Sequence, residues 1–210
     1  FDEPELVDEK PTFMKEMYFD EIYHARTAFE HLKGFPPYEN THPPLGKIFI
    51  MLGIAVFGMN PFGWRIVGTL FGIFMLPIMF IFAKRLFKDT RYATLAMLLF
   101  ALDGMHFVQT RISTIDVYVV FFIILMCYFM YRYWQMNFFV DDLKKTFVPL
   151  GLCGVMFGLG IASKWIGFYA GAGLAVTLLL SFVMRYFEYK KAKQALADGS
   201  QADTQFLTEF

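Results

Sequence analysis

Charged residues are scarce in this chain of 210 residues, where Lys, Arg, Asp and Glu together make up 18%. A soluble domain carries about 25%. The 19 basic and 19 acidic residues cancel, so no overall field favours nucleic acid or an acidic partner. The informative feature is therefore where each charge lies along the chain.

Cysteine is also rare. The two cysteines, Cys127 and Cys153, both lie in apolar runs and lack the spacing of a metal site or a disulfide framework. We expect both to be packing residues. We also expect no secretory leader in this stretch, because it opens with the acidic FDEPELVDEKPTF and closes with the polar KQALADGSQADTQFLTEF. These ends lead us to expect a piece of a longer protein.

Apolar residues, in contrast, are abundant: they make up 57% of the chain, and 27 of them are Phe. This excess predicts an all-α, polytopic membrane protein. The apolar runs predict five transmembrane helices within residues 62–187, at 62–83, 92–107, 115–134, 147–162 and 166–184. Residues 1–61 then form a first loop, and residues 188–210 form a polar tail.

Basic residues predict the orientation of these spans. The loop KRLFKDTR (84–91) and the segments after the third and fifth spans carry most of the Lys and Arg, whereas the alternating loops hold one cation each. By the positive-inside rule, the basic loops and the tail are cytoplasmic, and the first loop is external.

The run 45–57 decides where the first loop lies. If it spanned the membrane, residues 1–44 would be cytoplasmic. Its length favours a helix in the membrane interface, as does the preceding Pro43–Pro44, which suits a helix start. We therefore expect two surface-lying helices in an external loop, at about 19–33 and at 45–57, joined by a proline-rich connector.

An adjacent pair of acids, Asp20–Glu21, stands in the first of these helices, within MYFDEIYHARTAFE (17–30). A solvated helix N-terminus explains such a pair, because acids there favour the helix dipole. The aromatic and branched neighbours on both sides favour a functional role instead.

Two cations follow near the external surface. Lys47 comes two residues into the apolar run of THPPLGK, which also holds His42, and Arg65 lies beside a Trp at the start of the 62–83 span. Each has a structural interpretation, as a snorkelling or interfacial anchor. Each also suits a lipid phosphate, and Arg suits it in a bidentate way.

A third group of ionisable residues surrounds the other external turns. Asp103, Arg111 and Asp116 lie around one turn, and Lys164 lies in the next. Carboxylates at the edge of a span usually face a cavity or a partner. Arg111 is the obvious partner, so a supporting ion pair is expected at least as much as direct catalysis, and we expect Lys164 to snorkel or support the site.

All these charges fall on one predicted face of the membrane. A transporter places charges near the midplane and often shows internal repeats, and neither is evident here. A carboxylate pair with several cations on one face instead favours a site that activates a nucleophile and holds a membrane-anchored anion. A transporter or partner-binding protein is the rival interpretation from another class.

The motifs YFDE, HPPLGK, WR, TRISTID and ASKWIGFYAG occur in an order that resembles the protein O-mannosyltransferases of the GT-C glycosyltransferase superfamily. The resemblance covers about residues 17–169. It implies part of a GT-C helical bundle in the plasma membrane, and RISTID favours a bacterial member.

The resemblance also implies roles for the site residues. Asp20 looks like the catalytic acid of the family's Asp–Glu pair and Glu21 its neighbour; Lys47 and Arg65 look like the cations on the donor phosphate. His42, Asp103, Arg111, Asp116 and Lys164 then support the site.

The function implied is inverting transfer of mannose from a polyprenyl-phosphate donor to Ser or Thr of a protein on the external side, with Asp20 as general base. The partners implied are this donor, the protein acceptor and membrane lipids, with no nucleic acid. Another lipid-phosphate glycosyltransferase, acting on a lipid or glycan, is the close alternative. Asp20, Glu21, His24 and His42 are possible ligands of a divalent ion, although their spacing is not that of a metal site.

Overall fold

The computed structural model describes residues 16–136 and 143–197, and all of their regular structure is helical. The all-α prediction is therefore confirmed. In chain order the helices are α1 (Glu21–Lys33), α2 (Leu45–Phe57), α3 (Pro61–Phe87), α4 (Thr90–Ala101), α5 (Gly104–Gln109), α6 (Asp116–Trp134), α7 (Leu143–Ser163) and α8 (Gly167–Ala197).

Four of the described helices, α3, α6, α7 and α8, are long and apolar enough to cross a membrane. Their ends follow from local chemistry. Asn60 caps α3 by accepting a hydrogen bond from the N–H of Gly63 at 3.0 Å, and Pro61 occupies the first helical position, where its missing N–H costs nothing. The helix ends at Phe87, and the next residue, Lys88, adopts a left-handed conformation with φ 55°.

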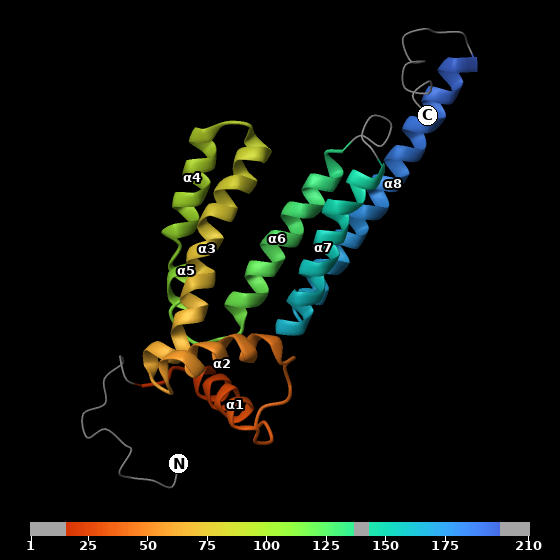
Figure 1. The fold of residues 1–210 in the computed structure, drawn as a ribbon. Helices are drawn as coiled ribbons and strands as arrows, with labels where there is room; N and C mark the ends of the chain where they lie inside the picture. Colours follow the sequence, from red (N-terminus) through yellow and green to blue (C-terminus); the bar gives the residue numbers. More distant parts are fainter. Residues whose placement is uncertain (1–15, 137–142, 198–210) are drawn as a thin grey trace, which may run out of the picture.

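The segment expected to span at 92–107 is divided into two helices, α4 and α5. The break lies at Leu102–Asp103, where the Asp103 carboxylate accepts a hydrogen bond from the N–H of His106 at 2.8 Å and so caps α5. Figure 1 shows α4 running back beside α3, with α5 continuing towards the end of the bundle at which α3 begins. A fifth span formed by this pair of helices stays a prediction.

The short helix α2 lies across the end of the bundle, crosswise to the long helices, with α1 beside it on the outer side (Figure 1). Gly46 permits this arrangement, because a Cβ there would lie 2.8 Å from Ile115 Cγ2 and 3.4 Å from the carbonyl oxygen of Ser163. The helix is thus seated against the start of α6 and the end of α7.

An aromatic cluster joins α2 to the bundle. The ring of Phe49 lies 5.0 Å from Phe71 and 5.1 Å from Tyr118, and Phe71 lies 4.9 Å from Tyr118. Aromatic rings at these separations stabilise a core beyond the area they bury. The cluster fixes α2 to α3 and α6, and it holds the site end of the molecule together.

At the opposite end, α8 continues as a helix to Ala197, into the segment expected to be a tail; residues 198–210 of that segment, like residues 1–15 of the first loop, lie outside the described part of the chain.

Candidate functional site

Glu21 is fully buried and connects three parts of the chain that are distant in sequence. Its carboxylate accepts hydrogen bonds from Arg65 Nε and Nη2 at 2.7 Å each, and from Trp64 Nε1 at 3.1 Å. The backbone N–H groups of Tyr18 and Ser113 donate to it at 2.9 Å each. Glu21 therefore anchors the start of α1 to the start of α3 and to the turn before α6.

Burial by itself would raise the pKa of the Glu21 carboxyl. The hydrogen bonds from Arg65, Tyr18 and Ser113 outweigh burial and hold the pKa below its ordinary value. Glu21 is thus a charged group with its lone pairs in use, which suits an anchor. Asp20, the other acid of the pair, does not take part in this set of contacts.

Asp20 lies half-buried just before α1 and makes no side-chain capping bond. Within the part of the chain that the structure describes, its carboxylate has no hydrogen bond or ion pair. The preceding residue, Phe19, adopts φ 51°, a left-handed conformation that is strained for a bulky side chain. Such strain tends to occur at functional sites. The turn at Phe19 sets the direction in which the chain enters Asp20.

Lys47 is 1% exposed and pairs with Glu39, an acid that the sequence analysis did not single out. Its ammonium also donates to the carbonyl oxygens of Glu39 at 2.7 Å and of His42 at 3.2 Å. Burial alone would raise the pKa of Glu39, but the bonds from Lys47 and Thr41 lower it to about 2. The only signal in the sequence was one acid inside a proline-rich connector.

The two predicted phosphate-binding cations are thus engaged by carboxylates, Lys47 by Glu39 and Arg65 by Glu21. Either would have to exchange that partner for a phosphate. Phosphate binding by these residues stays a prediction.

His24 and His42 lie close together, with ring centroids 6.1 Å apart. His24 is 3% exposed, and burial lowers its pKa to about 4, so it is neutral at physiological pH. The Nδ1 atoms of both rings are buried without a hydrogen-bond partner. Among the described residues, no group of three or more His, Cys, Asp and Glu side chains is arranged to hold a metal ion, so the structure lends the possible divalent site no support.

The expected pairing of Arg111 with a carboxylate is wrong. Asp116, at the start of α6, pairs instead with Lys164, whose Nζ lies 2.7 Å from its Oδ1. Asp103 serves as the cap of α5. Arg111 is exposed, and its guanidinium stacks over the ring of Phe107 at 4.6 Å.

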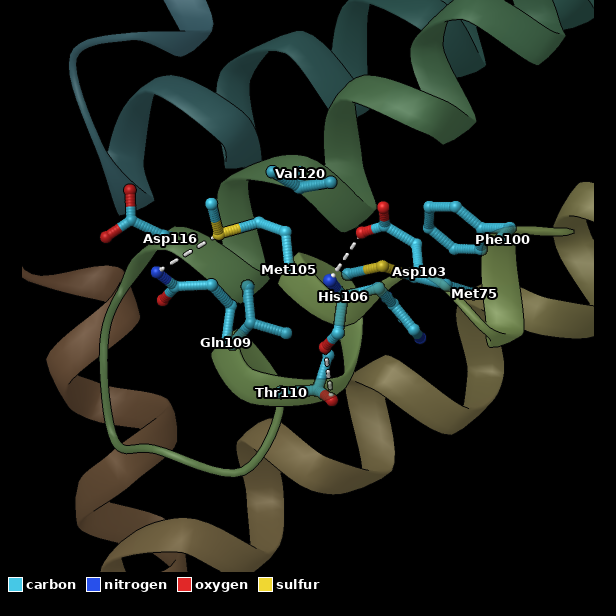
Figure 2. A pocket seen from close by; sticks show the side chains of 10 residues that line it. Met75, Phe100, Asp103, Met105, His106, Gln109, Thr110, Asp116 and Val120 are labelled. Atoms are coloured by element: carbon cyan, nitrogen blue, oxygen red, sulfur yellow. Dashed lines mark hydrogen bonds between the residues drawn. The ribbon is translucent and has the colours of Figure 1, made fainter.

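A cavity of about 320 Å³ lies between α3, α4, α5 and the start of α6. Figure 2 shows Asp103 and Asp116 on opposite sides of it, with Met105, Gln109 and Thr110 between them. Most of its lining is apolar. Two carboxylates beside an apolar surface make it a poor place for a phosphate.

A second cavity, of about 430 Å³, lies between the connector and the turn that joins α7 to α8. Its lining is more polar and includes Glu39, His42 and Trp165. Trp165 Nε1 donates to the carbonyl oxygen of Thr41 at 3.1 Å, which ties this turn to the connector.

Figure 1 shows α1, α2, the starts of α3, α6 and α8 and the end of α7 at the same end of the bundle. These elements carry Asp20, Glu21, Lys47, Arg65, Asp116 and Lys164, and the turn before α6 carries Arg111. The contacts described above join them across the sequence. These seven residues are therefore gathered at one end of the bundle.

Comparison with known proteins yields one family and several relatives. Residues 41–197 match the family described as dolichyl-phosphate-mannose-protein mannosyltransferase. A polyprenol-phosphate-mannose–protein mannosyltransferase of Mycolicibacterium smegmatis is 30% identical over a stretch that covers 72% of this chain and 33% of that protein. Its namesake in Corynebacterium glutamicum is 34% identical, over 65% of this chain and 29% of the relative.

A more distant relative is protein O-mannosyl-transferase 1 of Danio rerio, 24% identical over 75% of this chain and 24% of the relative. The chain thus spans a third or less of the length of these proteins. No solved structure matches the chain significantly.

Proposed function

The chain belongs to the dolichyl-phosphate-mannose–protein mannosyltransferase family, and from this premise we propose that it carries the base and the phosphate-side cation of a protein mannosyltransferase. The donor is mannose on a polyprenyl phosphate, and the acceptor is a Ser or Thr hydroxyl of a protein. The names of the bacterial relatives support this donor and acceptor class. The chain covers only part of their length, so the complete activity belongs to the full protein.

The site is proposed to face the outside of a bacterial plasma membrane. The long apolar helices make this an integral membrane protein, and the basic loop 84–91 lies at the end of the bundle away from α1 and α2 (Figure 1). Under the positive-inside rule that end is cytoplasmic. The crosswise helix α2 then lies at the external surface, where the phosphate of a lipid donor also lies.

Asp20 is proposed as the general base. The observation that carries this role is the contrast between two adjacent acids. Glu21 is saturated by five donors from three segments, whereas the Asp20 carboxylate has no such partner among the described residues. A base needs a free lone pair for the proton that it removes.

Arg111 is proposed as the cation in direct contact with the donor phosphate. It is exposed, and it lies two residues before Ser113, whose N–H bonds to Glu21 at 2.9 Å. Two residues of chain cover at most about 7 Å, so the backbone of Arg111 lies near the contact that joins this turn to Glu21. Stacked on Phe107, the group is pre-organised, and its N–H edge suits a phosphate.

In the proposed reaction, Asp20 takes up the proton and Arg111 stabilises the charge of the leaving phosphate. The acceptor hydroxyl gives its proton to Asp20 while its oxygen attacks the anomeric carbon of mannose from the face opposite the phosphate. The bond between that carbon and the phosphate oxygen breaks, the configuration inverts, and polyprenyl phosphate leaves with the bonding electrons. Arg111 stabilises the charge that grows on the phosphate.

The test uses the full-length protein in membranes, supplied with polyprenyl-phosphate [¹⁴C]mannose and a Ser/Thr-rich peptide. We expect label in the peptide and none with an otherwise identical peptide in which Ala replaces every Ser and Thr. Label that enters only lipid or glycan would assign the site to another lipid-phosphate glycosyltransferase instead.

A further inference from the structure

Glu39 organises the connector between α1 and α2. Its Oε1 accepts hydrogen bonds from the backbone N–H groups of Thr41 at 2.7 Å and His42 at 3.1 Å, and from the Thr41 hydroxyl. Its own N–H donates to Thr27 Oγ1 of α1 at 3.3 Å. This one residue folds the connector back on itself and holds it against α1.

Lys47 completes the arrangement from α2. An ammonium group has three N–H donors. Lys47 donates to the carbonyl oxygens of Glu39 and His42 and forms an ion pair with the Glu39 carboxylate, and its side chain is 2% exposed. The cation is therefore engaged inside the protein, and the pair forms a buried tether between α2 and the connector.

The tether reaches the rest of the site through two neighbours of Glu39. The carbonyl oxygen of Thr41 accepts a hydrogen bond from Trp165. Lys164, which precedes Trp165 in the chain, pairs with Asp116 at the start of α6. On the other side, the ring of His42 lies against His24 of α1, the helix that Asp20 precedes. The residues next to Glu39 thus contact both α1 and the α7–α8 turn.

We propose that Glu39 is a positioning residue of the transferase site, which acts by holding Lys47 as a tether and so fixing the connector between α1 and the α7–α8 turn. The effect of Glu39 on mannose transfer rests on the proposed function, whereas the contact between Glu39 and Lys47 does not. The rival role for Lys47, a direct ligand of the donor phosphate, predicts the opposite sign: removing Glu39 would then release Lys47 and strengthen donor binding.

The first test measures the tether without activity. The full-length protein in detergent is treated with an amine acetylating reagent, and modification of each lysine is followed by mass spectrometry. We expect Lys47 to react much more slowly than the exposed Lys33 in the wild type, and at a rate comparable to Lys33 in Glu39→Gln. In Glu188→Gln, a matched loss of an acid paired with Arg185 at the other end, Lys47 stays protected. Lys47 that is reactive in the wild type, or still protected in Glu39→Gln, overturns the proposal.

The second test measures mannose transfer by the same variants. We expect Glu39→Gln to lower kcat/KM by about 10- to 100-fold, the range for a displaced site, mainly through kcat. Glu39→Asp keeps the charge and restores part of the rate. The double variant Glu39→Gln/Lys47→Gln is no worse than the single one, because both remove the same tether. Tighter donor binding in Glu39→Gln, or additive losses, would overturn it. If the wild type transfers no mannose, the proposed function fails, and lysine protection still decides the tether.

Discussion

Arg65 and Glu21 form a two-pronged ion pair across 44 positions of sequence, with Nε–Oε1 and Nη2–Oε2 distances of 2.7 Å. The pair joins the start of the first long helix, α3, to the start of α1. Because the Glu21 side chain is 0% exposed and that of Arg65 is 19% exposed, the pair is poorly screened by solvent. It fixes the position of the neighbouring Asp20 relative to the bundle.

Glu21→Gln is expected to destabilise the protein, because it leaves the guanidinium of Arg65 partly buried without its charge partner. Breaking a buried pair costs about 3 to 5 kcal/mol, and the exposure of Arg65 places this case near about 3 kcal/mol. Thermal unfolding of the full-length protein in detergent measures it. Glu188→Gln serves as the control, since that acid is exposed at the other end. An inactive Glu21→Gln protein with unchanged stability would show that Glu21 acts in chemistry rather than as an anchor.

Arg65→Lys is expected to lower the thermal stability although it keeps the charge, because an ammonium cannot meet both carboxylate oxygens in the way that a guanidinium does. The same thermal measurement applies, and Arg91→Lys at the opposite end is the matched control. Wild-type stability in Arg65→Lys would mean that the charge alone suffices.

The free energy of unfolding is expected to fall as the pH is lowered from about 6.5 to 4, because of His24. Burial lowers its pKa in the folded protein to about 4 from an ordinary 6.5, so in this interval only the unfolded chain takes up the proton. The contribution is present above pH 6.5 and is lost as the pH falls towards 4. At about 1.4 kcal/mol per unit of pKa the loss is about 3 kcal/mol. Asp20, Glu39, Lys47 and His42 face His24, and the test leaves all four residues unsubstituted.

Unfolding of the wild type and of His24→Asn across this pH range measures that loss. The variant is expected to show a flatter dependence, because the residue that gains the proton on unfolding is gone. Parallel curves would assign the pH dependence to other groups.

Gly46→Ala is expected to cost about 1 to 3 kcal/mol, the usual range for overpacking, because the new Cβ would lie 2.8 Å from Ile115 Cγ2. Gly154→Ala, where a Cβ meets nothing within 4 Å, provides the control in another helix. Thermal unfolding of the two variants measures the difference in stability. Equal stability of the two variants would show that α2 is not seated against α6 in the way described.

Arg111→Ala is expected to raise the KM for the lipid donor by about tenfold or more, since a hydrogen bond to a charged group contributes about 1.5 to 3 kcal/mol. Arg91→Ala removes an exposed arginine from the other end and is expected to leave the KM unchanged. If Arg111→Ala leaves donor KM at the wild-type value, another cation holds the phosphate.

The sequence predicted the helical class and the grouping of charges at one end, because both follow from the alternation of long apolar runs and polar turns. The run 45–57 is a helix with those bounds, Leu45–Phe57. The break in 92–107 carried a local signal, since Asp103 precedes a glycine and Asp is a common helix cap. Reading that signal as a cap rather than as an intramembrane charge would have divided the segment correctly.

The choice of partners could not be predicted in the same way. Asp116 pairs with Lys164, 48 positions away, rather than with the nearer Arg111, whose guanidinium stacks over the ring of Phe107. Glu39 was missed for a related reason. Its importance comes from the fold of an irregular connector around a buried lysine, and neither periodicity nor a motif encodes that fold.

The most direct measurement of the central claim compares mannose transfer by the wild type, Asp20→Asn and Asp89→Asn in membranes that contain the full-length protein. Asp89 caps α4 at the opposite end, so its amide replacement provides a matched control. The account predicts a loss of about 10²- to 10⁴-fold in turnover for Asp20→Asn alone, with donor binding retained. Turnover of Asp20→Asn at the wild-type rate would contradict the assignment of Asp20 as the base.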